Sequence, residues 1–277
     1  MSDISNHDAV PAAPATPVLD LRALTSARVA LERTGISVTT RHALEFSLAH
    51  AQARDAVHSA LAVPSLMAAL RERGLTPLAV CSAASNRTEY LRRPDLGRTL
   101  ANSSAELLAA RRGEDRKPGT VVSVILADGL SAFAVERHAL PLLDALLPLL
   151  RLGTDAAATK AADWALAPVI VAEQARVALG DAVGAALEAH VTVMLIGERP
   201  GLTSPASLGT YITWAPRPGR NDAERNCVSN IHTEGLGYAA AAAKIAWFVT
   251  EARRLGLTGV DLRESNMPRL SESGSGV

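Results

Sequence analysis

Runs of aliphatic residues alternate with polar, turn-forming residues along the second half of the chain. The clearest run, VTVMLI at 191–196, is typical of a strand buried on both faces. It ends at 197–201, GERPG, where two glycines and a proline predict a turn. Further strands are expected at 78–82, 121–127, 169–172, 208–215 and 260–262. Helix-forming segments separate most of them, which predicts a parallel sheet with right-handed crossovers. We expect Pro141 to break or kink one of these helices.

Strong helix formers dominate the first half of the chain. The run 40–62 predicts a long helix, Pro64 opens another, and Ser103 with Glu106 matches a capping box. We therefore predict an α/β fold, in which a Rossmann-like, mostly parallel sheet is flanked by helices and preceded by a helical N-terminal region. The expected organisation is a disordered leader (1–19), a mainly helical N-terminal domain (20–116), a Rossmann-like α/β domain (117–263) and a polar tail (264–277).

The composition excludes several classes of partner. Basic and acidic residues balance at 28 each, which favours neither nucleic acid nor an anionic membrane. No apolar run approaches the roughly 18 residues of a membrane span, and residues 1–19 lack the pattern of a signal peptide. Cys81 and Cys227 have no zinc-site spacing and are expected to be reduced thiols. We thus predict a cytoplasmic protein without a metal site.

Polar residues follow three of the expected strands, at 128–131, 173–177 and 197–201. The carboxyl ends of parallel strands lie at one edge of a sheet, where ligands bind. These segments contain no dinucleotide fingerprint, P-loop or nucleophile elbow, so we expect them to hold a ligand and assign no catalytic residue. Two alternatives stay open: a salt-bridged surface turn at 197–201, or a hydrolase using Asp128 and Ser131.

Basic side chains gather in two other segments. His42, His50, Arg54 and His58 share one helix face, which suits either an anionic ligand or a solvated or interface surface. The segment 86–98 contains four arginines with Pro and Gly. It predicts an irregular basic loop that either binds phosphate or a carboxylate surface or docks a partner protein.

The charged segment 217–232 predicts a long functional loop. Within it, Cys227 lies close in sequence to Arg225, whose charge would lower the pKa of a reactive thiol. The alternative, and the commoner case, is a packed and unreactive thiol.

Five strings carry a resemblance to a known family. They are LRRPDLGR (91–98), LADGLS (126–131), ARVALGDAVG (175–184), LIGERPGL (195–202) and AERNCVSNIH (223–232). In this order they resemble the small subunit of ethanolamine ammonia-lyase, and the match covers roughly 26–262. The resemblance implies a subunit of an adenosylcobalamin-dependent lyase (EC 4.3.1.7) that converts ethanolamine to acetaldehyde and ammonia.

The resemblance also implies a cofactor site and a partner. Val177, Glu198 and Cys227 would contact adenosylcobalamin, and a large (β/α)₈-barrel subunit would carry the chemistry. The expected assembly is a hetero-oligomer with six copies of each subunit, in the cytoplasm or in a bacterial microcompartment. However, residues 1–19 lack the apolar helix face that would direct entry into a compartment. The alternative is a stand-alone module that binds a nucleotide- or cobalamin-like ligand.

One nearby motif points to a different mode of cobalamin binding. The string NIHTEG at 230–235 is close to D-x-H-x-x-G, the pattern of proteins whose histidine ligates cobalt. Asn230 replaces the aspartate that would orient the imidazole. We therefore interpret His232 as a loop or interface residue.

Overall fold

The computed structural model describes residues 21–25, 27–111, 119–150 and 164–263. The chain divides into two compact units, Met1–Phe46 and Ser47–Val277. The expected leader and polar tail lie outside the described residues.

The first unit contains short elements. Helix α1 spans Leu21–Leu24, and strands β1 (Arg33–Thr34) and β2 (Ser37–Val38) pair as an antiparallel hairpin. Gly35 occupies the turn at a φ of +63°, a left-handed conformation that glycine adopts without strain. Helix α2, Thr40–His58, begins in this unit and continues into the second.

The second unit is built on a seven-stranded sheet with the order β3-β6-β4-β7-β8-β9, and β5 also pairs with β4. The strands are β3 (Pro77–Cys81), β4 (Thr120–Ala127), β5 (Trp164–Leu166), β6 (Val169–Glu173), β7 (Val191–Gly197), β8 (Leu208–Trp214) and β9 (Asn226–Ile231). Strands β3, β6, β4 and β7 are parallel, whereas β8 runs antiparallel to both β7 and β9.

The α/β class predicted from the sequence is confirmed. The sheet is mixed, because β8 returns antiparallel beside β7, so the description of it as Rossmann-like is not adopted. The sheet also draws on both expected domains, 20–116 and 117–263, since β3 from the first pairs with β6 from the second.

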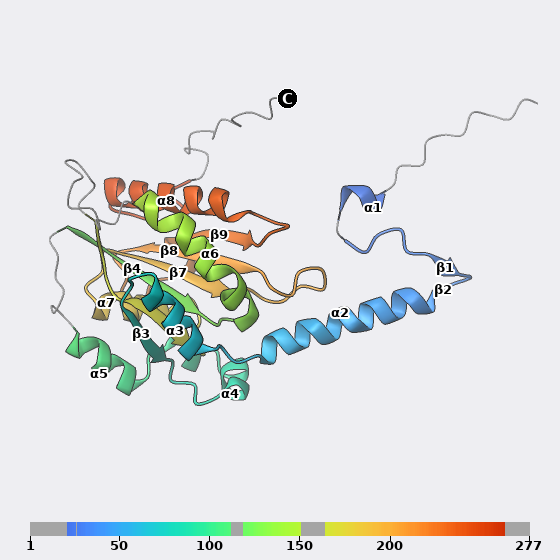
Figure 1. The fold of residues 1–277 in the computed structure, drawn as a ribbon, viewed down its shortest axis with the longest axis horizontal. Helices are drawn as coiled ribbons and strands as arrows, with labels where there is room; N and C mark the ends of the chain where they lie inside the picture. The colour runs from blue at the N-terminus through green and yellow to red at the C-terminus, as the bar shows by residue number, and fades with distance from the viewer. Residues whose placement is uncertain (1–20, 26, 112–118, 151–163, 264–277) are drawn as a thin grey trace, which may run out of the picture. The chain divides into compact units, whose positions relative to one another are not determined.

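Helices cover both faces of the sheet (Figure 1). One face packs against α3 (Val63–Glu72), α6 (Ala132–Leu150) and α8 (Tyr238–Leu255). The other packs against α5 (Asn102–Ala110) and α7 (Leu179–Ala186). Helix α4 (Arg87–Arg92) and the 3₁₀ turns η1 (Leu96–Arg98) and η2 (Asp222–Glu224) lie in connecting segments.

Two apolar clusters form the core, one on each face. Val193 and Leu195 of β7 point into the first cluster, whereas Met194 and Ile196 point into the second, as the two-residue period of a strand requires. Because β7 is buried on both sides, its sequence is almost entirely apolar.

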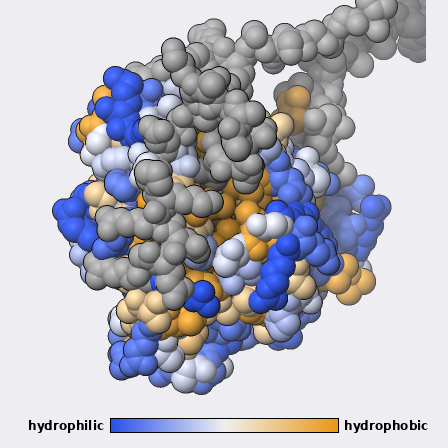
Figure 2. All heavy atoms as spheres, turned by 60° about the vertical axis from the view of Figure 1, so that its left-hand side comes forward, coloured by the Kyte–Doolittle hydropathy of each residue, from blue (hydrophilic) through white to orange (hydrophobic). Residues whose placement is uncertain are grey.

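Hydrophobic residues also reach the molecular surface. On the face shown in Figure 2 they lie among hydrophilic ones.

Several sequence predictions are corrected by the structure. Residues 260–262 form a turn and not a strand, and the expected loop 217–232 contains strand β9. The expected basic loop 86–98 contains helix α4. Helix α6 continues through Pro141 without the break that was one of the two outcomes we expected there. Helix α5 begins without the capping box of Ser103, and its Ser104 hydroxyl accepts instead from the backbone N–H of Cys81.

Candidate cofactor-contacting face

The three polar strand ends meet as the sequence predicted. The Asp128 carboxylate accepts hydrogen bonds from the backbone N–H groups of Gln174 and Ala175, at 2.9 and 3.0 Å. The N–H of Leu130 donates to the carbonyl of Gly197 at 2.9 Å. The ends of β4, β6 and β7 are therefore tied together by hydrogen bonds.

The polar groups of the β4 end serve this structural role. Asp128 is buried and also contacts Arg87 at 3.3 Å. Burial raises the pKa of Asp128, against the opposite effect of the backbone N–H groups and of Arg87. The hydroxyl of Ser131 donates to the carbonyl of Pro205 at 3.2 Å. Because these contacts include no base positioned to activate the serine, the geometry does not support the hydrolase alternative.

Glu198 lies immediately after β7, and its carboxylate reaches across β8. It accepts a 2.5 Å hydrogen bond from the Ser207 hydroxyl and a 3.3 Å bond from the N–H of Asn230. Gly209 makes room for it, since a Cβ there would lie 2.9 Å from Glu198 Oε1. These contacts hold the Glu198 carboxylate beside β9. The alternative of a salt-bridged surface turn at 197–201 would instead have left this carboxylate directed to solvent.

Cys227 lies in β9 directly opposite Tyr211 in β8. The two side chains form a hydrogen bond, and Cys227 is exposed on the sheet surface. Burial raises the pKa of the Cys227 thiol, the Tyr211 hydrogen bond lowers it, and the charge of Glu198 raises it. Burial, Cys227 and Glu198 together raise the pKa of Tyr211 to about 12. The raised pKa indicates a thiol that is protonated at neutral pH. Of the two alternatives, the structure therefore favours the commoner one, an unreactive thiol, over a reactive thiolate beside Arg225.

Val177 lies just before α7, at the wall of a cavity of about 530 Å³. The cavity is open to solvent on one side and is lined by Arg98, by the start of α7, by Tyr211 and by the loop 218–222. The backbone N–H groups of the residues that open a helix have no partner within the helix. Here the first bond of the α7 turn is donated by Leu179, so the N–H groups of Val177 and Ala178 precede it.

Tyr211 is the residue that links the three predicted positions. It lines the same cavity as Val177, pairs with Cys227, and feels the charge of Glu198. The structure therefore brings Val177, Glu198 and Cys227 to one region, on the face of β8 and β9 opposite to α6 and α8. The sequence analysis did not single out Tyr211, which lies within the expected strand 208–215.

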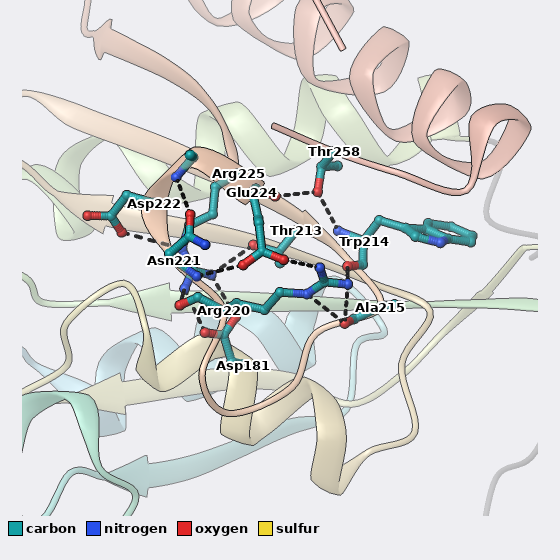
Figure 3. A network of polar contacts seen from close by, with 11 residues as sticks. Asp181, Thr213, Trp214, Ala215, Arg220, Asn221, Asp222, Glu224, Arg225 and Thr258 are labelled. Atoms are coloured by element: carbon teal, nitrogen blue, oxygen red, sulfur yellow. Dashed lines mark hydrogen bonds and ion pairs between the residues drawn. The ribbon is translucent and has the colours of Figure 1, made fainter. Parts of the chain in front are cut away.

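A buried ion pair fixes this region (Figure 3). Both terminal nitrogens of Arg225 donate to the carboxylate of Asp181 in α7, at 2.6 and 2.7 Å. Arg225 also donates to the Thr213 hydroxyl and to the carbonyl of Arg220. The same loop is closed by Arg220, which binds Glu224 and the carbonyls of Trp214 and Ala215. The start of β9 is thereby tied to α7.

The segment 86–98 packs against the end of β6. Tyr90 is sandwiched between the guanidinium groups of Arg87 and Arg176, at 4.7 and 4.4 Å from its ring centroid. Its hydroxyl donates to the carbonyl of Ala175 at 3.0 Å. Part of the basic segment thus stabilises the fold, while Arg98 remains at the cavity.

The remaining candidates have local roles. His42 contacts Glu45 at 3.1 Å, and His232 contacts Asn230 at 2.9 Å in the turn after β9, in the loop position expected for it. Within the described ranges, no group of three or more His, Cys, Asp or Glu side chains is arranged to hold a metal ion. No described helix combines the length and apolarity needed to cross a bilayer.

The fold and site define an α/β protein with a polar face that borders a cavity between α7 and β8. Residues 15–263 match the family model of the ethanolamine ammonia-lyase light chain. The chain belongs to this family, whose members are subunits of that lyase. It is 52% identical to the ethanolamine ammonia-lyase small subunit of Bradyrhizobium diazoefficiens, over 94% of this chain and 95% of the relative. It is 50% identical to that of Azotobacter vinelandii over 95% of each chain.

Proposed function

We propose that this chain is the small subunit of an adenosylcobalamin-dependent ethanolamine ammonia-lyase, and that it holds the cobalamin against a large catalytic subunit. Val177, Glu198 and Cys227 are the proposed contacts. The observation that carries the proposal is their convergence around Tyr211 on one partly open face. The proposed partner is the large subunit, in an assembly with six copies of each, in the cytoplasm or a microcompartment.

The polar groups on this face suit a corrinoid. A carboxylate offers about four acceptor positions, and Glu198 uses two of them for Ser207 and Asn230. The remaining positions can accept from the amide groups that surround a corrin ring. Val177 contributes backbone groups, and the protonated thiol of Cys227 contributes a weak donor beside them. The residues present therefore fit the group.

These residues bind and orient, and they do not react. Adenosylcobalamin, when bound, supplies the radical chemistry of the reaction. Tyr211 and Cys227 keep their protons at neutral pH, since their ordinary pKa values already lie well above 7 and burial raises both further. The two neutral groups and the carboxylate, which Ser207 and Asn230 hold in place, form this part of the proposed pocket wall. Residues that position a cofactor while the cofactor supplies the chemistry are consistent with a subunit that encloses that cofactor.

The alternative is a stand-alone module that binds a nucleotide- or cobalamin-like ligand. One observation favours this alternative: residues of this chain alone line the cavity beside Val177 on several sides. It predicts tight cobalamin binding by the isolated chain. The proposed function predicts that tight binding requires the large subunit.

The test reconstitutes the chain with a large subunit of the same family. Ammonia release that depends on ethanolamine, adenosylcobalamin and both chains is the expected result. Glu198→Gln should weaken cobalamin binding about tenfold or more, since a hydrogen bond to a charged group contributes roughly 1.5–3 kcal/mol. Glu234→Gln, the same change at an exposed position, serves as the control. Failure of the two wild-type chains to co-elute or to bind cobalamin would overturn the proposal.

A further inference from the structure

The cavity beside Val177 carries positive charge that the protein itself does not neutralise. Three arginines and two aspartates, Arg98, Arg176, Arg220, Asp181 and Asp222, lie in its wall. Both terminal nitrogens of buried Arg225 donate to the Asp181 carboxylate. Arg225 does not line the cavity, so the negative charge of Asp181 is neutralised by a group outside it. Asp222 extends into solvent, with its side chain 94% exposed and 3.6 Å from Arg225.

The arginines differ in their partners. Arg220 is saturated by Glu224 and two backbone carbonyls. In the part of the chain that the structure describes, neither Arg98 nor Arg176 has a carboxylate within ion-pair distance, and the side chain of Arg98 makes no hydrogen bond. Two unpaired cations thus lie on the same cavity.

Arg176 is held in a fixed orientation. Its guanidinium stacks 4.4 Å from the centroid of the Tyr90 ring, and Nη2 donates to the Tyr90 carbonyl at 3.4 Å. Its Nε is buried without an acceptor among the described residues. Gly97 allows this packing, because a Cβ there would lie 2.8 Å from the Tyr90 ring and 2.9 Å from Arg176 Cγ. A preorganised guanidinium with unused N–H groups is a typical binding group for an oxyanion.

Backbone donors adjoin the arginines. Val177 and Ala178 lie within the turn that leads into α7, which the Leu179 N–H closes by donating to the Arg176 carbonyl, and they line the cavity with Arg98 and Arg176. N–H groups at the start of a helix favour an anion. Together with the two guanidinium groups they form a set of donors without a matching acceptor among the described residues.

We propose that Arg98 and Arg176 bind a phosphate group in this cavity, and that it is the phosphodiester of the cobalamin nucleotide tail. The second half of this statement rests on the proposed function. The phosphodiester carries one negative charge and two unesterified oxygens, which match two guanidinium groups. Free inorganic phosphate shares this chemistry and is the other source that the experiment must distinguish.

The experiment compares two corrinoids on the reconstituted complex with the large subunit. Cyanocobalamin contains the nucleotide and its phosphodiester, whereas cobinamide lacks both. Binding is followed by the absorbance of the corrin. Arg98→Gln and Arg176→Gln should each weaken cyanocobalamin binding about tenfold to a hundredfold, the effect of losing one charge-assisted bond, and leave cobinamide binding unchanged. Arg92→Gln, an exposed arginine of the same segment that does not line the cavity, should change neither.

The outcomes separate this inference from the proposed function. Equal weakening of both corrinoids, or of neither, overturns the phosphate site while the cofactor-holding role stands. Absence of cyanocobalamin binding by the wild-type complex overturns the proposed function itself. Calorimetry measures binding of inorganic phosphate to the isolated chain. If Arg98→Gln abolishes phosphate binding but leaves cyanocobalamin binding unchanged, the assignment of the site to the nucleotide tail is overturned. Arg98 is exposed, so its variant decides the matter if Arg176→Gln does not fold.

Discussion

Asp181 and Arg225 form a two-bond ion pair in which each side chain is only 2% exposed. The pair joins the start of α7, beside Val177, to the start of β9, two residues before Cys227. It therefore connects two of the three proposed cofactor contacts through the interior and not through the surface.

Breaking this pair should destabilise the protein strongly. Asp181→Asn removes the hydrogen-bonded counter-ion of buried Arg225 and leaves only the solvent-exposed Asp222, 3.6 Å away. Removal of one partner of a buried pair costs roughly 3–5 kcal/mol. Urea denaturation of the wild-type and variant chains measures the loss in the free energy of unfolding.

The exposed pair between Arg93 and Asp95 provides the control for this prediction. Arg93→Gln should cost about 1 kcal/mol or less, as is usual for surface ion pairs. A similar loss for Asp181→Asn and Arg93→Gln would show that burial of the Asp181–Arg225 pair has no energetic consequence.

Gly209→Ala should displace the carboxylate of Glu198. A Cβ at this position would approach Glu198 Oε1 to 2.9 Å and Cγ to 3.1 Å. We expect weaker cobalamin binding by the reconstituted complex with a moderate loss of stability, of about 1–3 kcal/mol for overpacking. Gly237→Ala is the matched control, because a Cβ there would meet no atom within 4 Å. Unchanged cobalamin binding by Gly209→Ala would contradict the role given to Glu198.

The reactivity of Cys227 should show its raised thiol pKa. Burial, the largest effect, and the charge of Glu198 both favour the protonated form, so the midpoint of its alkylation profile should lie above pH 9.0, the ordinary value. Glu198→Gln removes one of these effects and should shift the midpoint to lower pH. Alkylation with iodoacetamide at a series of pH values, followed by mass spectrometry of the Cys227 peptide, measures both midpoints. A wild-type midpoint below 9.0 would refute the assignment.

His138 should make stability depend on pH below neutrality. It is buried between the Tyr238 hydroxyl, at 2.8 Å from Nδ1, and the Ala206 carbonyl, at 3.1 Å from Nε2. Burial lowers the pKa of His138 from its ordinary value of 6.5. The unfolded chain therefore binds this proton more tightly, so the contribution to stability is present above pH 6.5 and is lost as the pH falls through the lower folded-state pKa.

His138→Gln should flatten this part of the pH profile of the free energy of unfolding. Urea denaturation between pH 7.5 and about 5 measures the slope in both chains. The mutation of exposed His58 to Gln is the control, since that side chain lies on a solvent-facing part of α2. An unchanged slope in His138→Gln would assign the acid sensitivity to other groups.

The strands predicted best were those with the least exposed side chains. β4, β6 and β7 are buried along nearly their whole length, so their runs of Val, Ile and Leu identify them without knowledge of the fold. β9 was missed because its sequence, NCVSNI, alternates between a buried and a partly open face and is mostly polar. Its strand conformation is fixed by pairing with β8, which is a long-range contact that a local pattern does not reveal.

Helix α4 carried a local signal that the arginines obscured. Asn86 caps the helix by accepting from the N–H of Glu89, and Glu89 accepts in return from the N–H of Ser85. Asn followed three residues later by Glu is a recognisable helix start. In the same way, the convergence of strand ends was predictable from topology, but the role of Tyr211 depends on the antiparallel register of β8 against β9.

The reversal of β8 explains why this protein has a free surface to offer at all. Parallel strands require a crossover connection, usually a helix laid over one face. Here the chain turns back on itself twice, from β7 to β8 and from β8 to β9, and neither connection contains an α-helix. Helix α8 packs against one face of the last two strands, and the opposite face is the one on which the proposed corrin ring and the proposed companion subunit would be seated.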